Sequence, residues 1–145
     1  MTQYINNTQK LLQTAQPKQG IVYQEEGSKP RPREIESAKW LVNHLGGDVQ
    51  FLAESKEQGI EMADIKWRGS LLEMKHLGGN LNTLRRKIGR GLQQSQGEGL
   101  LIDTSDMRFA IDDILSTAID AMNTYKGRYL ILVKDDKLIG YIYQK

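Results

Sequence analysis

The most constraining feature of the sequence is a pair of alternating apolar and polar runs on either side of Arg68 and Gly69. The segment IEMADIKWRGSLLEMKHL covers residues 60–77, and a glycine-containing dipeptide between two such runs is typical of a β-hairpin with a two-residue loop. That loop predicts four pairs across the hairpin: Trp67 with Ser70, Lys66 with Leu71, Ile65 with Leu72, and Asp64 with Glu73. The register therefore places two carboxylates opposite each other.

Two acids and a lysine are predicted to share one face of this hairpin. Side chains alternate between the faces of a strand, so Asp64, Glu73 and Lys75 point one way and the apolar residues between them point the other way. Like charges opposite each other destabilise a sheet unless something neutralises them, and Mg²⁺ binds carboxylate oxygens and water. A nearby lysine can stabilise developing phosphoryl charge or help to deprotonate water. The stretch therefore predicts a metal-dependent phosphodiester-cleaving centre; the alternative is a set of charges that solvates the outer face of an antiparallel hairpin.

The composition indicates one globular domain. The chain has 145 residues, of which 39% are hydrophobic and 26% are charged, as in ordinary globular proteins. No apolar run approaches the length of a transmembrane helix, and no basic region followed by an apolar core marks a signal peptide, so we expect a cytoplasmic protein that does not bind membranes. Cysteine is absent, which excludes disulfides, thiol nucleophiles and cysteine-type zinc sites.

The net charge of +2 is small, but the charges are unevenly distributed. Between Lys66 and Arg90 there are seven Lys or Arg residues and one acid, Glu73. A basic patch beside the candidate centre suits a polyanionic partner such as a nucleic acid. The two histidines, His44 and His76, are too few for a histidine-rich metal cluster. A metal-independent ribonuclease built on them is a further alternative, for which the sequence marks no acid–base partner.

Residues 1–29 differ from the rest of the chain in composition. They are rich in Gln, Asn and Thr and are interrupted by Pro17, Gly20 and Gly27, which predicts a polar leader or linker with at most a weak helical turn or two.

Residues 30–145 are predicted to form the domain. Periodicity, cap and turn signals give its elements: a helix at 33–45 stopped by Gly46 and Gly47, a strand at 48–54, the hairpin, a helix capped by Asn80 or Asn82 and reaching residue 94, a strand at 99–103, a helix capped by Thr104 or Asp106 and reaching residue 125, and strands at 128–134 and 137–143 joined at Asp135 and Asp136.

The first helix of the domain carries an acid on its apolar face. Glu34 falls four residues before Ala38, which continues to Leu41 and Leu45 at spacings of three and four. Glu34 is either a first-turn acid favoured by the helix dipole or a catalytic acid that points at the metal. Glu36, on the adjacent face, is the substitute candidate.

The second helix of the domain is predicted to have a basic surface. Four cations lie away from its apolar stripe: Arg85, Arg86, Lys87 and Arg90. Such a surface is either solvated or, beside a metal site, binds phosphates. Gln94 shares a face with Lys87 and Arg90 and is expected to hydrogen-bond the substrate backbone. Gly89 and Gly91 each weaken the helix by about 1 kcal/mol relative to alanine, which predicts close packing there.

The order of elements is helix, three strands, helix and strand, followed by an appended helix and a C-terminal hairpin, which defines an α/β fold with a mixed (α+β) sheet. This αβββαβ order, with an acid on the second strand and Glu-X-Lys on the third, resembles the restriction-endonuclease-like core of the PD-(D/E)XK nuclease superfamily. The motif here is Asp64, eight intervening residues, and Glu73-Met74-Lys75. Asp103, at the end of the next strand, is either an accessory catalytic acid or a cap.

Within that superfamily, residues 30–145 resemble the C-terminal tRNA nuclease domains of contact-dependent growth-inhibition (CdiA-type) toxins. The matching segments occur in the same order: Arg33-Glu34, Ala63-Asp64, residues 72–75, Gln94-Ser95 and residues 101–103. Ala63 stands where the family has a proline, which shapes the strand and takes no part in the chemistry.

The resemblance implies a metal-dependent ribonuclease that cleaves phosphodiester bonds in tRNA. Asp64 and Glu73, with the Met74 carbonyl, are the expected ligands of Mg²⁺ or Mn²⁺. Lys75 is expected as an orienting cation or base, and Glu34 as an outer ligand or proton acceptor. A cognate immunity protein, and delivery into target cells as part of a larger toxin, are further implications. Two alternatives stay open: a metal-dependent DNA endonuclease of the same fold, which nicks DNA or resolves junctions, and a non-catalytic nucleic-acid-binding module.

Overall fold

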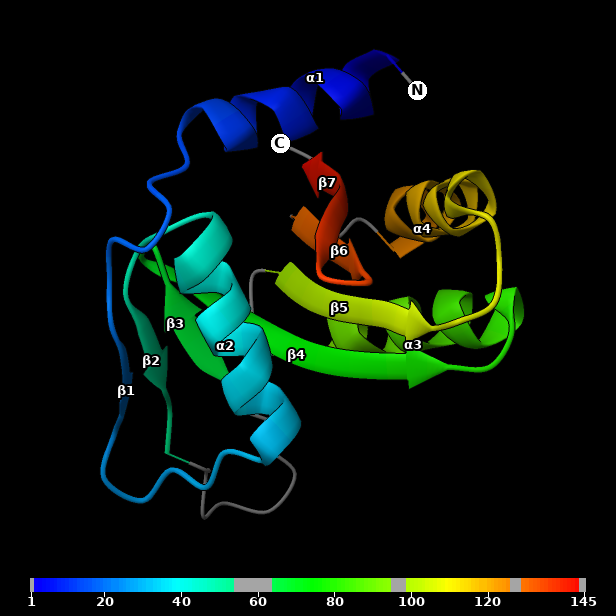
Figure 1. Ribbon diagram of the computed structural model, residues 1–145. Coiled ribbons are helices and arrows are strands. Elements are labelled where there is room, and N and C mark those ends of the chain that lie inside the picture. The colour runs from blue at the N-terminus through cyan, green and yellow to red at the C-terminus, as the bar shows by residue number, and fades with distance from the viewer. Residues whose placement is uncertain (1, 54–63, 95–98, 126–128, 144–145) are drawn as a thin grey trace.

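The structure, a computed structural model, describes residues 2–53, 64–94, 99–125 and 129–143. Its strands are β1 (Val22–Gln24), β2 (Val49–Phe51), β3 (Ile65–Trp67), β4 (Ser70–Gly78), β5 (Gly99–Asp106), β6 (Tyr129–Lys134) and β7 (Lys137–Tyr143). Its helices are α1 (Thr2–Gln13), α2 (Pro32–His44), α3 (Leu81–Gln94) and α4 (Ile111–Tyr125). The predicted fold is confirmed: α2, β2, β3, β4, α3 and β5 form the αβββαβ core, and α4 with the β6–β7 hairpin follows it (Figure 1).

The described strands form a seven-stranded mixed sheet whose spatial order follows the sequence, from β1 to β7. β2, β3 and β4 are antiparallel to their neighbours in this group, whereas β4, β5 and β6 run parallel. β1 adds in parallel to β2 at one edge, and β7 pairs antiparallel with β6 at the other. The parallel part needs the crossover helices α3 and α4, which connect β4 to β5 and β5 to β6.

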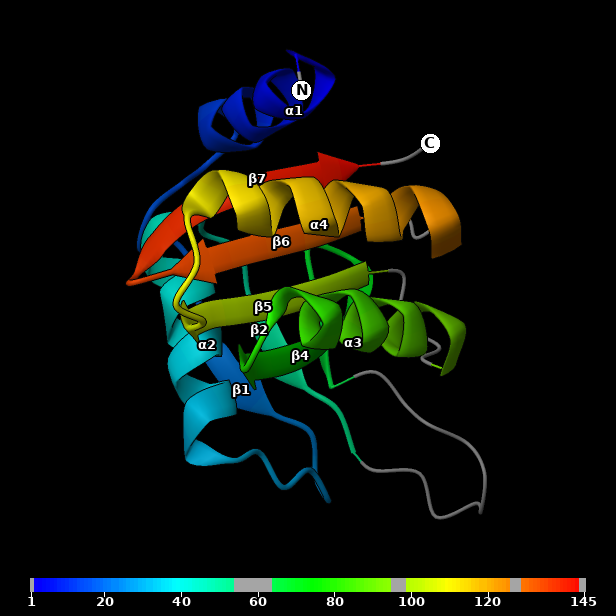
Figure 2. The ribbon, with the colours of Figure 1, turned by 90° about the vertical axis from the view of Figure 1, so that its right-hand side faces the viewer.

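The helices cover the sheet on both faces. α2 lies on one face, and α3 and α4 lie side by side on the opposite face (Figures 1 and 2). Leu101 packs with the α2 core, while its neighbours Leu100 and Ile102 pack with the core under α3 and α4. Because successive side chains alternate between faces, this pattern also assigns each polar residue of the adjacent strands to a face.

The β3–β4 hairpin has the predicted loop and most of the predicted register. Arg68 (φ 48°) and Gly69 (φ 77°) both have positive φ, as a type I′ turn requires. Three ladder pairs are confirmed: Ile65 with Leu72, Lys66 with Leu71, and Trp67 with Ser70. The fourth predicted pair, Asp64 with Glu73, is wrong. β3 begins at Ile65, and the Asp64 carboxylate, instead of a backbone carbonyl of β3, accepts the Met74 N–H of β4.

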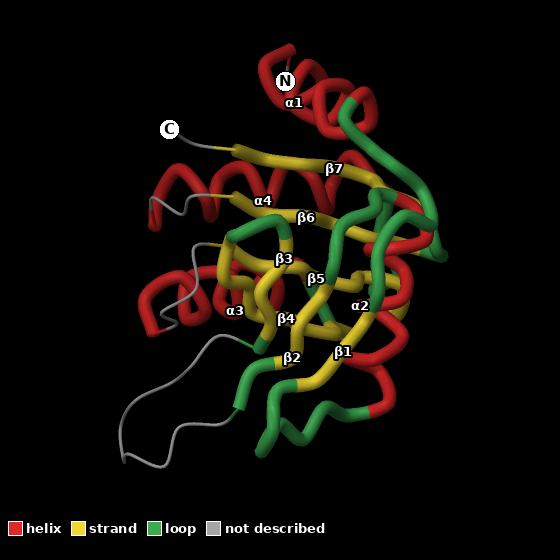
Figure 3. The backbone as a smooth tube through the Cα atoms, turned by 90° about the vertical axis from the view of Figure 1, so that its left-hand side faces the viewer, coloured by secondary structure: helices red, strands yellow, loops and turns green. Residues whose placement is uncertain are grey.

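Residues 1–29 contain more regular structure than a leader with weak helical turns. α1 lies along β7 (Figure 3), where the Tyr141 N–H donates to Thr8 Oγ1 (3.0 Å) and Leu11 is buried. β1 joins the sheet edge, and Ile21 there accepts the Val49 N–H through its backbone oxygen (2.9 Å). The sequence gives only a weak indication of these two elements. Leu12 of α1 is half exposed, and β1 is held by backbone hydrogen bonds, which require no alternation of apolar side chains.

Several predicted boundaries change. β5 extends to Asp106 and α4 begins at Ile111, so neither Thr104 nor Asp106 caps that helix. The reason is that the Thr104 hydroxyl donates to the Val133 carbonyl (2.9 Å) and Asp106 binds His76. Asn80 does cap α3, since its Oδ1 accepts the Thr83 N–H (2.9 Å). Residues 54–63, with Ala63 of the predicted motif, and residues 95–98 lie outside the described residues, as does the side chain of Gln94.

Candidate active site

Asp64 lies directly before β3 and joins that strand to β4. Its backbone N–H donates to the Leu72 carbonyl (3.0 Å), and its carboxylate Oδ2 accepts the Met74 N–H (2.8 Å). Asp64 lies outside β3, directly before the fully buried Ile65, and its half-buried side chain takes the position on β4 that a further residue of β3 would have. An acid is thereby held against the centre of β4.

The environment of Asp64 disfavours its ionised form. Burial raises its pKa from the ordinary value of 3.8 to about 6, although the Met74 N–H opposes the rise. The negative charges of Glu34 and Glu73 raise the pKa further, and the positive charge of Lys75 lowers it. Glu34, Glu73 and Lys75 therefore all lie close enough to influence Asp64, and a cation beside Asp64 would favour its carboxylate form.

Glu73 and Lys75 form an ion pair on β4. Lys75 Nζ lies 3.1 Å from Glu73 Oε1, and the two side chains are 18% and 19% exposed. The other carboxylate oxygen, Glu73 Oε2, is buried and has no hydrogen-bond partner among the described residues. Since a buried carboxylate oxygen normally has a partner, this atom marks a place where a ligand can bind.

Helix α3 packs directly on the Lys75 side chain. A Cβ atom placed on Gly91 would lie 3.0 Å from Lys75 Cε and 2.9 Å from Leu100 Cδ2, so the predicted close packing is confirmed at this glycine. Lys87 lies four residues before Gly91 and is half-buried, which places it on the same side of α3. The basic helix and the acidic hairpin are therefore adjacent.

Glu34 occupies the first turn of α2 and interacts with two parts of the structure. Its Oε1 accepts the Arg31 N–H (2.8 Å), as expected for an acid that caps the helix start. Its charge also raises the pKa of Asp64. Glu36, the substitute candidate, instead lines a pocket with Trp40.

The hairpin residues fit a divalent cation with few protein ligands. Among the residues that the structure describes, no group of three or more Asp, Glu, His or Cys side chains is arranged to hold a metal ion. Asp64 and Glu73 form a smaller set, in which one acid has a raised pKa and the other has a buried oxygen without a partner in the described chain. Mg²⁺ commonly uses one or two carboxylates and keeps several waters, so this pair suits it.

The cations of α3 differ in their surroundings. Arg85 forms an ion pair with Asp120 of α4, so its charge is partly neutralised. Arg86 and Arg90 are exposed, and neither has a hydrogen bond or ion pair with another described residue. These two residues, with Lys87, offer the positive charge that a polyanion can reach.

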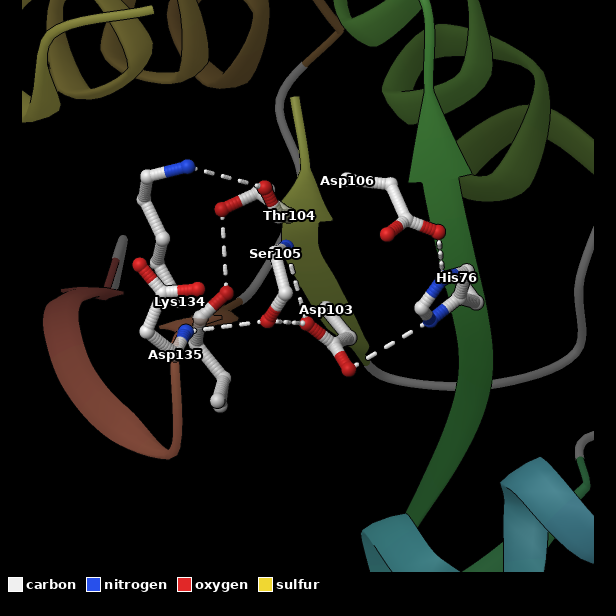
Figure 4. A network of polar contacts seen from close by, with 8 residues as sticks. His76, Asp103, Thr104, Ser105, Asp106, Lys134 and Asp135 are labelled. Carbon is white, nitrogen blue, oxygen red and sulfur yellow. Dashed lines mark hydrogen bonds and ion pairs between the residues drawn. The ribbon is translucent and has the colours of Figure 1, made fainter. Parts of the chain in front are cut away.

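Asp103 lies apart from the other predicted site residues. Its side chain belongs to the α2 face, where Oδ2 contacts His76 Nδ1 (3.3 Å) and Oδ1 accepts hydrogen bonds from the Ser105 N–H and hydroxyl (2.9 and 2.5 Å). His76 Nε2 lies 2.6 Å from Asp106 Oδ2, so the ring is held between two carboxylates (Figure 4). His76 follows Lys75 and therefore points to the opposite face of the sheet.

This network borders a second feature that the sequence did not predict, which we call the α2 pocket. It has a volume of about 250 Å³ and lies between α2 and the ends of β4, β5 and β6. The residues that line it are Arg33, Glu36, Ser37, Trp40, His76, Leu101, Asp103, Asp106, Val133 and Asp136. They come from several elements far apart in the sequence, and although the sequence marked Glu36 and Asp103 as candidate site residues, it did not indicate that they share a pocket.

No protein-family model and no curated protein matches this chain. A solved structure does: a chain of the CdiA-CT/CdiI toxin and immunity complex from Burkholderia pseudomallei superposes with a TM-score of 0.62 and 16% sequence identity. The match covers 85% of this chain and 99% of that chain. At this identity the similarity shows the fold, a mixed α/β architecture like that of the CdiA-CT structure. No described helix is both long enough and apolar enough to cross a membrane.

Proposed function

We propose that this protein is a metal-dependent nuclease of the PD-(D/E)XK type that cleaves tRNA and acts as a toxin. The observation that carries the proposal is the grouping of Asp64, Glu73 and Lys75 on one hairpin, with a raised pKa at Asp64 and a buried, unpartnered oxygen on Glu73 within the described chain. The fold similarity to a chain of the CdiA-CT/CdiI complex supports the toxin assignment. The tRNA assignment is supported by the order of motifs.

The hairpin residues divide the chemistry among them. Asp64 and Glu73 would hold Mg²⁺ or Mn²⁺. When bound, the cation supplies positive charge that stabilises a phosphoryl group and makes water more acidic. Lys75, positioned by Glu73 and by the backbone of α3 at Gly91, stabilises charge that develops on the scissile phosphate. Glu34 accepts a proton through water.

The exposed surface of α3 binds the substrate backbone. Arg86, Lys87 and Arg90 contact phosphates, and Gln94 adds a hydrogen bond. Because Lys75 packs on Gly91 of the same helix, a backbone held along α3 extends toward Glu73. Phosphate contacts of this kind position a nucleic acid without reading its sequence.

The test is incubation of the purified chain with total tRNA and with plasmid DNA, each in Mg²⁺, Mn²⁺ or EDTA. We expect metal-dependent cleavage of tRNA that Asp64→Asn and Glu73→Gln abolish. The matched control is Glu26→Gln, which removes an exposed acid outside the site and should cleave like the wild type. Cleavage of DNA alone would replace tRNA with the DNA endonuclease alternative. Absence of cleavage of both substrates by a folded protein would leave the nucleic-acid-binding module.

A cognate immunity protein is the partner that the toxin proposal implies. The structurally similar chain comes from a toxin and immunity complex. Expression of the wild-type chain alone in a bacterial cytoplasm should arrest growth, whereas Glu73→Gln should be tolerated. Equal growth of both strains at equal protein levels would contradict the toxin role.

A further inference from the structure

The α2 pocket combines an apolar interior with a polar rim. Leu101, Val133 and Trp40 are nearly fully buried and form its apolar lining. Trp40 is fixed in place, because its Nε1–H donates to the Asp136 carbonyl (3.0 Å) and its ring stacks on His44 with the centroids 4.8 Å apart. The volume of about 250 Å³ is smaller than that of most pockets for drug-sized ligands. A single planar heterocycle matches this size and lining.

One wall of the pocket is rigid and its carboxylates are already occupied. Asp103 and Asp106 hold the two nitrogens of His76, and Asp103 is itself held by Ser105, whose Oγ also accepts the Asp135 N–H (2.9 Å) (Figure 4). The hydrogen bond from His76 lowers the pKa of Asp106, so this acid stays ionised at neutral pH. The His76 wall is thus a preformed structure rather than an adaptable one.

Two other carboxylates at the rim are available to a ligand. Glu36 projects from α2 and Asp136 lies in the β6–β7 turn, and both are exposed. Neither side chain has a hydrogen bond or ion pair with any other residue that the structure describes. Glu36 stands on a regular helix, which gives it the more fixed position. The pocket therefore presents hydrogen-bond acceptors to whatever enters it.

We propose that the α2 pocket binds one unpaired guanine base of the nucleic-acid substrate and that Glu36 reads its Watson–Crick edge. This inference rests on the proposed function and adds a base preference to it. Guanine presents two adjacent N–H donors, at N1 and N2, which match the two oxygens of one carboxylate. Adenine and cytosine place an acceptor beside their amino group, and uracil places acceptors on both sides of its N–H, so a carboxylate repels these edges. The base packs on Trp40, as turned-out bases pack on aromatic side chains in other enzymes.

The position of the pocket suits the same nucleic acid that occupies the active site. Arg33 and Glu36 line the pocket, and Glu34, which the proposed function assigns to the active site, lies between them in the sequence at the first turn of α2. The first turn of α2 therefore borders both sites. A strand that crosses this turn can place a phosphate at the hairpin and a base beside Trp40. Arg33 adds a positive charge that can contact a phosphate of this strand. The same charge would repel an arginine of a protein partner.

The test is nucleoside binding to the full chain in EDTA, where cleavage cannot interfere. Guanosine, inosine and adenosine are titrated, and the indole N–H resonance of Trp40 is followed by NMR. We expect guanosine to bind about tenfold more tightly than adenosine, with inosine, which lacks the N2 amino group, between them. Glu36→Gln should remove this preference, and Glu26→Gln should keep it.

Equal affinities for guanosine and adenosine, or a preference that survives Glu36→Gln, would overturn the inference. It would also be overturned if Glu36→Gln weakened binding of a protein partner and left nucleoside affinity unchanged. The outcome is separable from that of the proposed function. Guanosine preference in a chain that cleaves no nucleic acid contradicts the nuclease proposal alone, whereas tRNA cleavage without guanosine preference contradicts the pocket alone.

Discussion

Asp64→Asn is expected to stabilise the metal-free protein at neutral pH. The wild-type protein must hold a carboxylate in a site that raises its pKa from 3.8 to about 6, and the amide is neutral at every pH. Without screening by water, this pKa difference corresponds to about 3 kcal/mol in the free energy of unfolding. Because the side chain is only half-buried, water screens the interaction, and we expect a gain of about 1–2 kcal/mol in the free energy of unfolding. The asparagine Oδ1 can still accept the Met74 N–H.

The gain should depend on pH in one direction. Asp64 has a higher pKa in the folded chain than in the unfolded chain, so between pH values of about 4 and 6 the folded state binds more protons. The contribution of Asp64 to stability is therefore fully present below the unfolded pKa and is lost as the pH rises through the folded pKa. The difference between Asp64→Asn and the wild type should be small near pH 4 and should reach about 1–2 kcal/mol by pH 7.

Urea unfolding followed by circular dichroism in EDTA, at several pH values between 4 and 7, measures this difference. Glu26→Gln is the control, since it removes an exposed acid and should show no such pH-dependent gain. Adding Mg²⁺ at pH 7 should stabilise the wild type and leave Asp64→Asn unchanged. A difference that stays constant with pH, or an Asp64→Asn protein that is less stable than the wild type at pH 7, would refute the account of Asp64 as a destabilising acid.

Three further changes test other parts of the structure. Arg86→Glu with Arg90→Glu should lower the salt dependence of tRNA affinity, measured by fluorescence anisotropy in EDTA. The slope of log affinity against log salt concentration should fall by the equivalent of about two phosphate contacts. An unchanged slope would place the nucleic-acid surface elsewhere. Gly91→Val should lower the free energy of unfolding, measured by thermal unfolding, by about 1–3 kcal/mol and reduce cleavage, because the valine side chain would displace Leu100 and Lys75. Wild-type stability together with wild-type cleavage would contradict the close packing at this position. Gly69→Ala should cost about 1–2 kcal/mol through its φ of 77° alone, since no atom lies within 4 Å of an added Cβ, and an unaltered melting temperature would argue against the type I′ turn.

The parts of the fold that the sequence predicted correctly are those fixed by local rules. The two-residue loop at Arg68 and Gly69 determined three ladder pairs of the hairpin, and the same reasoning located the turn at Asp135 and Asp136, whose φ angles are 51° and 63°. The apolar stripe predicted for the second helix of the domain likewise matches the buried side of α3, which includes Leu84 and Ile88. In each case the determining contacts lie within a few residues of one another.

The features that the sequence did not reveal depend on residues far apart in the chain. Arg85 looked like a free cation because its partner, Asp120, lies on another helix. Asp103 could be assigned to neither face until β5 was known to pair with β4, where it lies opposite His76. The α2 pocket requires Trp40 and Asp136 to meet, although 96 residues separate them. The roles of the candidate site residues stay predictions, because their chemistry awaits the cleavage assay.

The contact between α1 and β7 makes docking of this helix depend on a strand far along the chain, since 133 positions separate Thr8 from Tyr141. Leu11 belongs to the core that also contains Ile65 and Leu72 of the hairpin, and Thr8 receives the Tyr141 N–H from the last strand. During synthesis, α1 cannot dock on β7 until that strand has been made. Contacts between distant segments form slowly because a long loop must close first. The core that Leu11 shares with the hairpin is therefore completed only after β7 has emerged.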